Sequence, residues 1–127
     1  MVDRIMKILI ADDDTVMLSL LRTLMELEDN QVVTATRPEE IIPTVEREQP
    51  ALILMDYNLA GGNSMDALDT LKSDSDLRKI PIIVTSGMDR KHECIEAGAD
   101  DFILKPFRPA QLIEHVQEIA RQSLDQS

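Results

Sequence analysis

The sequence predicts an α/β domain built on a doubly wound parallel sheet. Short apolar runs alternate five times with longer segments in which apolar residues recur at helical spacing. The apolar runs are continuous, as in strands that helices cover on both faces. The chain has 127 residues, which is the size of one domain. We therefore expect five βα units in a single sheet, joined by right-handed crossovers.

The first two βα units are predicted over the N-terminal third of the chain. Residues 7–11 form an apolar run, and residues 15–28 carry apolar side chains at helical spacing. A second strand is predicted over 32–35. Pro38 and the two acids after it are typical of a helix start, whereas Pro43 is expected to kink or shorten that helix.

The other three units follow the same pattern. We expect strands over 51–55, 80–84 and 101–104, and helices over 64–71, 91–97 and from 109 to about 120. Ser64 is the expected cap of the third helix, behind a flexible loop at Gly61 and Gly62, and Gly98 stops the fourth helix. One domain is predicted over 1–127, with its core at about 6–120 and a fraying polar tail over 121–127.

Composition excludes several classes of function. Lysine and arginine number 13 against 24 aspartates and glutamates, a formal net charge of −11 that disfavours nucleic acids and anionic membranes. No apolar run approaches the roughly 20 residues of a membrane span. The single cysteine, Cys94, suits a reducing compartment. We expect an acidic cytoplasmic protein with protein partners, no direct nucleic-acid binding and no membrane insertion.

Polar side chains follow four of the five predicted strands. These residues are Asp12, Asp13 and Asp14 after the first strand, Asp56 after the third, Thr85 and Ser86 after the fourth, and Lys105 after the fifth. In an open parallel sheet, the carboxyl ends of the strands line the functional crevice. Each residue alone has an ordinary explanation, and Asp14 is best interpreted as a helix cap. Together, three carboxylates, a hydroxyl and an ammonium match a magnesium-dependent phosphoryl-transfer site with a carboxylate nucleophile.

The motifs ILIADDD, LILMDYN, PIIVTSG and AGADDFILKPF resemble those of two-component response regulator receiver domains, the chemotaxis-Y-like family. The resemblance covers about residues 6–119. It implies a flavodoxin-like fold with strand order 2-1-3-4-5. It also implies Mg²⁺, or Mn²⁺ in its place, bound by Asp12, Asp13, Asp56 and the backbone carbonyl of Asn58.

The resemblance further assigns Asp56 as the phosphoacceptor, with Lys105 and Thr85 binding the phosphoryl group. Thr85 and Phe102 would act as the switch, and the Lys105-Pro106 peptide bond would be cis. The phosphodonor would be a sensor histidine kinase or a histidine phosphotransfer protein. Phosphorylation would alter a face over about 91–121 for a downstream protein target. Such a domain catalyses its own phosphorylation and dephosphorylation, is a switch rather than a conventional enzyme, and is a monomer or a weak phosphorylation-dependent dimer.

Phe102 departs from the family pattern, and two alternative functions fit parts of the sequence. A phenylalanine at 102, where the family often has tyrosine, favours an inward side chain even without phosphate. Asp12 to Val16 also fits the D-x-D-x-V motif of haloacid-dehalogenase-like phosphatases, with Asp12 as nucleophile and Asp14 as acid, but that assignment leaves Asp56 unexplained. A phosphate-independent module on the same fold is the other alternative, although every key position is present. His92 and His115 are interpreted as surface residues.

Overall fold

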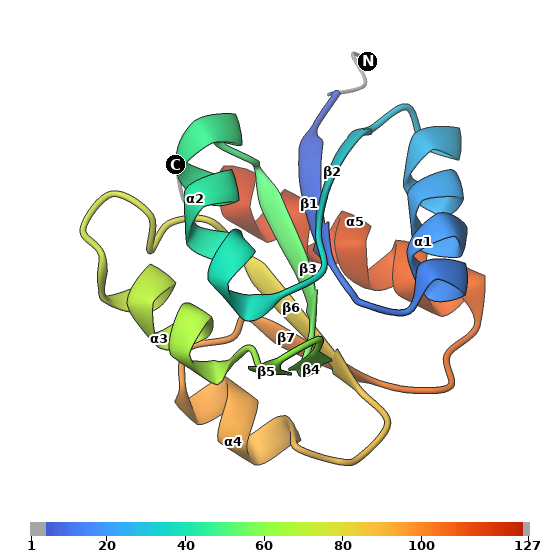
Figure 1. Ribbon diagram of the computed structural model, residues 1–127. Coiled ribbons are helices and arrows are strands. Elements are labelled where there is room, and N and C mark those ends of the chain that lie inside the picture. Colours follow the sequence, from blue (N-terminus) through green and yellow to red (C-terminus); the bar gives the residue numbers. More distant parts are fainter. Residues whose placement is uncertain (1–4, 126–127) are drawn as a thin grey trace.

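A five-stranded parallel sheet forms the middle layer of the protein, as the computed structural model of residues 5–125 shows (Figure 1). Its strands are β1 (Lys7–Ala11), β2 (Gln31–Ala35), β3 (Leu52–Asp56), β6 (Ile82–Ser86) and β7 (Asp101–Leu104). They lie in the order β2-β1-β3-β6-β7, all parallel. The predicted fold and the strand order 2-1-3-4-5 are therefore confirmed, with β6 and β7 as the fourth and fifth sheet strands.

Five helices cover the two faces of this sheet (Figure 1). They are α1 (Thr15–Leu27), α2 (Pro38–Glu48), α3 (Met65–Ser73), α4 (Lys91–Glu96) and α5 (Pro109–Asp125). Alternate strand residues point to opposite faces. Ile8 and Ile10 pack in one apolar cluster with α1 and α5, whereas Leu9 packs in the other with α2, α3 and α4. Burial on both faces explains the continuous apolar runs.

Pro43 lies inside the second helix, as predicted, but does not shorten it. The helix begins at Pro38, a position that suits proline because the first helical amide has no partner. It then continues through Pro43 to Glu48. Ile41 and Val45, on either side of the proline, are fully buried. Their burial stabilises the helix across the position where Pro43 removes an amide donor.

The segment after β3 is a small hairpin rather than a flexible loop. Strands β4 (Asn58–Leu59) and β5 (Gly62–Asn63) pair antiparallel. Gly61 at the turn has φ +92°, and a side chain there would begin 2.7 Å from the Arg37 guanidinium. The Ala60 amide donates to the Thr36 carbonyl at 3.2 Å. The hairpin is thus fastened to the segment between β2 and α2.

Three further details differ from the predictions. Ser64 precedes α3 as expected, but its hydroxyl donates to the Tyr57 carbonyl at 3.3 Å and makes no capping bond. Strand β6 ends at Ser86, so Thr85 and Ser86 lie within the strand. Helix α5 extends to Asp125, so most of the predicted tail is helical, and residues 126–127 lie outside the described residues. Within residues 5–125, no helix is long and apolar enough to cross a membrane.

Candidate functional site

The predicted polar residues meet at the carboxyl end of the sheet. Asp12 directly follows β1, and Asp56 is the last residue of the neighbouring strand β3. Thr85 of β6 lies in register beside Asp56. Lys105 directly follows β7 at the same end of the sheet. The parallel topology therefore collects side chains from four strands, as the sequence pattern predicted.

Three carboxylates form the centre of this site. One ligand oxygen from each of Asp12, Asp13 and Asp56 lies within 4.8 Å of the others, close enough to hold one metal ion. Asp12 is buried, Asp56 is mostly buried and Asp13 is exposed, so the cluster opens to solvent on the side of Asp13. Such a set of oxygens suits a hard divalent cation that retains part of its water shell.

Lys105 is the cation of the site. Its Nζ donates a hydrogen bond to Asp56 Oδ2 at 2.9 Å and lies 3.6 Å from Asp12 Oδ2. Burial lowers the pKa of Lys105, but the bond to Asp56 and the charges of Asp56 and Asp12 outweigh it, so this pKa is raised overall. The ammonium is therefore charged at neutral pH. The peptide bond between Lys105 and Pro106 is cis.

Asp12 is the least exposed of the three acids, at 1%. Its Oδ1 accepts a hydrogen bond from the Asp14 amide at 2.9 Å, whereas its buried Oδ2 has no hydrogen-bond partner among the described residues. Burial is the main cause that raises the pKa of Asp12, and the Asp56 charge adds to it, against the Asp14 amide and Lys105. A buried carboxylate oxygen with no hydrogen bond, and with its ammonium partner 3.6 Å away, is the feature that a bound cation would satisfy.

The other predicted residues flank this centre. Thr85 is buried between Asp56 on β3 and Ile103 on β7. Phe102 is 7% exposed and belongs to the apolar cluster under α4, so its side chain is directed inward, as expected for a phenylalanine. Asn58 lies in β4, two residues beyond Asp56.

Four residues outside the site are Asp14, the two histidines and Arg90. The Asp14 side chain caps α1 by accepting from the Val16 and Met17 amides at 3.0 and 3.1 Å. His92 is exposed on α4, and His115 contacts Asp101. Sequence reasoning missed Arg90, which packs on the ring of Tyr57. The signal that was available is the position of Tyr57, the only tyrosine, immediately after Asp56.

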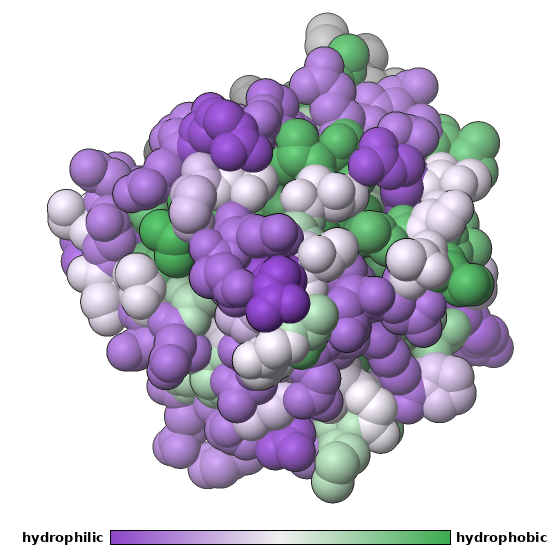
Figure 2. Space-filling model, in the orientation of Figure 1, coloured by the Kyte–Doolittle hydropathy of each residue, from purple (hydrophilic) through white to green (hydrophobic). Residues whose placement is uncertain are grey.

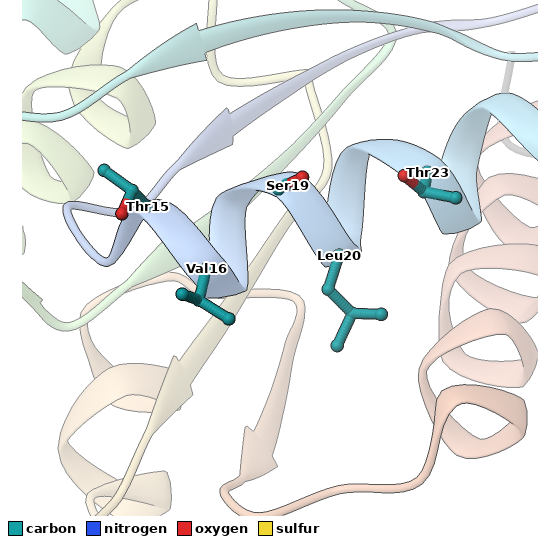
Figure 3. A pocket seen from close by; sticks show the side chains of 5 residues that line it. All are labelled: Thr15, Val16, Ser19, Leu20 and Thr23. Atoms are coloured by element: carbon teal, nitrogen blue, oxygen red, sulfur yellow. The ribbon is translucent and has the colours of Figure 1, made fainter.

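A shallow depression lies beside the site on the outer face of α1 (Figure 3). Its lining residues are Thr15, Val16, Ser19, Leu20 and Thr23. Val16 and Leu20 point to the same side of the helix in Figure 3 and are 78% and 43% exposed. Figure 2 shows a largely hydrophilic surface in this orientation, with apolar side chains gathered on the side of α1. The depression holds none of the carboxylates and is not part of the polar site.

Comparison with protein families gives one match over most of the chain. The family described as "Response regulator receiver domain" matches residues 8–117. Among curated proteins, the phosphate regulon transcriptional regulatory protein PhoB of Escherichia coli K12 is 28% identical over 118 residues. The alignment covers 91% of this chain and 52% of PhoB, so the chain spans about half the length of this relative.

Solved structures share the fold. A CheY-like response regulator receiver domain protein from Methanospirillum hungatei JF-1 has a TM-score of 0.89 and 26% identity, over 98% of this chain and 100% of that one. The receiver domain of the sensor histidine kinase PA1611 from Pseudomonas aeruginosa PAO1 has a TM-score of 0.82 and 23% identity, over 92% and 98%. That protein was solved with a magnesium ion coordinated in its active-site cleft.

Proposed function

The chain belongs to the family of two-component response regulator receiver domains, and we propose that Asp56 is its phosphoacceptor. One observation carries the assignment. Asp56 ends the central strand β3 with its carboxylate held by Lys105 at 2.9 Å, beside two further acids and in register with Thr85. No other carboxylate of the described site combines a bonded ammonium with a neighbouring hydroxyl residue. The haloacid-dehalogenase alternative is disfavoured because Asp14, its required acid, caps α1.

Receiver domains bind Mg²⁺, and we propose that this one does so through Asp12, Asp13, Asp56 and the main-chain carbonyl of Asn58, with Mn²⁺ as a substitute. The buried Oδ2 of Asp12, which has no hydrogen-bond partner among the described residues and an ion pair with Lys105 at 3.6 Å, supports this assignment, and so does the spacing of the three carboxylates. The three carboxylates and Lys105 leave a formal charge of −2, which a divalent ion would neutralise. When bound, the ion supplies positive charge for the phosphoryl oxygens.

The chemistry of this chain's own residues follows from their positions. A carboxylate oxygen of Asp56 attacks the phosphorus of a phosphohistidine carried by a sensor histidine kinase or a histidine phosphotransfer protein. The P–N bond breaks, its electron pair stays on the imidazole nitrogen, and a new O–P bond gives an acyl phosphate. Lys105 orients Asp56 and neutralises charge on the transferred group. Thr85 provides a hydroxyl donor to a phosphoryl oxygen.

Phosphorylation would act on the fold through charge. The acyl phosphate adds roughly −1.5 to −2 charges beside Thr85, and the Thr85 hydroxyl would turn towards it. The inward Phe102 would then occupy the space that Thr85 leaves. Because Phe102 lies on β7, the change reaches the face formed by α4, β7 and α5. We propose that this face binds the downstream protein target.

The remaining expectations form one consistent proposal. The chain acts as a single receiver domain and switch that catalyses its own phosphorylation and dephosphorylation, as a monomer or weak phosphorylation-dependent dimer. The net charge of −11 supports protein partners over direct contact with nucleic acid or membranes. The buried thiol of Cys94 supports the reducing cytoplasm as its compartment.

Incubation with acetyl phosphate and Mg²⁺, followed by intact mass measurement, tests the phosphoacceptor. The wild type should gain the mass of one phosphoryl group, and this gain should disappear in Asp56→Asn and in excess chelator. Asp69→Asn is the matched control, because Asp69 is an exposed acid on α3. A mass gain that persists in Asp56→Asn would refute the assignment. Sustained hydrolysis of a phosphomonoester that depends on Asp12 alone would instead support the phosphatase alternative.

A further inference from the structure

Tyr57 connects the end of β3 to helix α4. It stands between Asp56 and Asn58 and is 7% exposed. Its main chain is fixed on both sides, because its amide donates to the Thr85 carbonyl at 2.8 Å and its carbonyl accepts from the Ser64 amide at 2.9 Å. The Cα from which the Tyr57 side chain projects is therefore held at the strand end that carries Asp56.

Arg90 and Glu93 enclose the Tyr57 side chain from the side of α4. The Arg90 guanidinium carbon lies 4.2 Å from the centre of the Tyr57 ring, which is cation–π geometry. Arg90 Nη1 donates to the Tyr57 hydroxyl at 3.4 Å, and that hydroxyl donates to Glu93 Oε2 at 3.2 Å. Arg90 and Glu93 also form an ion pair at 3.5 Å. The three side chains, here called the Tyr57 clamp, form a closed set of contacts.

Arg90 is positioned by these contacts and by a hydrogen bond from its Nη2 to Met88 Sδ at 3.8 Å, rather than by helix capping. Arg90 occupies the cap position of α4 but makes no side-chain capping bond. Its Nε is buried and has no hydrogen-bond partner among the described residues. Since an unsatisfied buried donor is unfavourable, the ring of Tyr57 and the carboxylate of Glu93 must outweigh it. The clamp thus fixes the start of a helix of only six residues.

We propose that Tyr57, Arg90 and Glu93 couple the position of α4 to the phosphorylation site and hold α4 in place while Asp56 is unmodified. The proposal rests on the proposed function for the identity of that site. It adds a connection that does not pass through Phe102. Tyr57 follows Asp56 directly in the chain, and its side chain contacts Arg90 and Glu93 at the start of α4. A displacement of the strand end on phosphorylation would weaken the clamp and release α4.

The chain contains its own reporter for this release. Cys94 is the only cysteine, is fully buried in α4, and belongs to the same apolar cluster as Tyr57. Burial raises the pKa of the Cys94 thiol, which further slows alkylation of the folded protein. The alkylation rate with iodoacetamide, measured under native conditions without metal, therefore reports how often α4 moves away from the core.

Variants of Arg90 and Tyr57 test whether the clamp holds α4. Arg90→Met keeps the aliphatic stem but removes the cation, and should raise the Cys94 alkylation rate about tenfold. Tyr57→Phe keeps the ring and should cause a smaller rise, and Arg90→Lys should return the rate towards the wild-type value. His92→Ala is the control, because His92 is on the same helix and 89% exposed. Urea unfolding of each variant separates movement of α4 from global unfolding. Equal rates in Arg90→Met and wild type would overturn the clamp.

A second measurement tests the coupling to the site. Treatment with acetyl phosphate and Mg²⁺ should speed Cys94 alkylation in the wild type, and this increase should shrink in Arg90→Met because its helix is already released. Intact mass records phosphorylation of the same samples. Full phosphorylation with no change in alkylation, or an equal change in both proteins, would refute the coupling and leave the proposed function standing. Absence of the mass gain would refute the proposed function and the coupling, while the metal-free rates would still show whether the clamp holds α4.

Discussion

Replacement of Asp12 by asparagine removes a buried charge that destabilises the metal-free protein. The Asp12 and Asp56 ligand oxygens lie within 4.8 Å, so their repulsion at an effective dielectric constant near 20 is at least about 3.5 kcal/mol. The attraction of Asp12 to Lys105 at 3.6 Å is about 4.6 kcal/mol on the same scale. These contributions largely cancel, and the burial of the charge then decides the sign. We expect Asp12→Asn to stabilise the metal-free protein by about 1 kcal/mol.

The amide fits the same place. Its oxygen can accept from the Asp14 amide as Asp12 Oδ1 does, and at Oδ2 the substitution removes the ion pair with Lys105 but no hydrogen bond. Urea unfolding in chelator at neutral pH measures the gain. Added Mg²⁺ at about ten times its dissociation constant should stabilise the wild type by about 1.4 kcal/mol and leave Asp12→Asn unchanged. Asp13→Asn changes an exposed acid, so it should abolish the stabilisation by Mg²⁺ without making the metal-free protein more stable.

The pH dependence has a definite sign. The pKa of Asp12 in the folded protein is raised above its ordinary value of 3.8, mainly by burial. The folded state therefore binds this proton more tightly than the unfolded chain, and the unfavourable charge appears only as the pH rises through the raised pKa. The advantage of Asp12→Asn should thus be largest at neutral pH and disappear as the pH falls towards about 4. An Asp12→Asn variant that is less stable than the wild type in chelator at neutral pH would show that the buried Asp12 charge does not destabilise the metal-free protein.

Three other substitutions test separate parts of the structure. Lys105→Met should slow phosphorylation by acetyl phosphate about 10²-fold, as measured by intact mass. Mg²⁺ should still stabilise this variant, and an unchanged phosphorylation rate would contradict the role of the ammonium. Phe102→Ala should reduce the free energy of unfolding, measured by urea titration, by about 3 kcal/mol because the Phe102 ring is buried. A reduction under about 1 kcal/mol would mean that the ring does not fill the core. Gly98→Ala should destabilise by about 1–2 kcal/mol, because Gly98 has φ +111° and the new Cβ would lie 2.8 Å from Lys72 Cγ; unchanged stability would contradict this.

The centre of the site was predictable because parallel topology converts a local pattern into proximity. Asp12, Asp56 and Lys105 each stand at the end of an apolar run, and the carboxyl ends of parallel strands share one edge. Predicting that these residues meet required neither the distances between them nor the burial of Asp12. The number of apolar runs was also sufficient to predict the fold class, although not which residues end each strand.

The parts that sequence reasoning missed depend on contacts between distant segments. The β4–β5 hairpin has two-residue strands without any apolar periodicity, and its Ala60 amide donates to the Thr36 carbonyl of another loop. Tyr57 and Arg90 are 33 positions apart, and no spacing rule connects them. Helix α2 continues through Pro43 because buried neighbours stabilise it, which local propensity does not encode.

The shortness of α4 changes what kind of response the protein can give. A helix of six residues does not form on its own in water, where about 12–15 residues are needed for marginal stability. Its regular structure therefore exists only while Cys94 and its neighbours remain packed against the sheet. A signal that loosens this packing need not swing a rigid helix to a new position. It can instead turn an ordered surface into a disordered segment. A partner would then respond to the loss of the helix rather than to its movement.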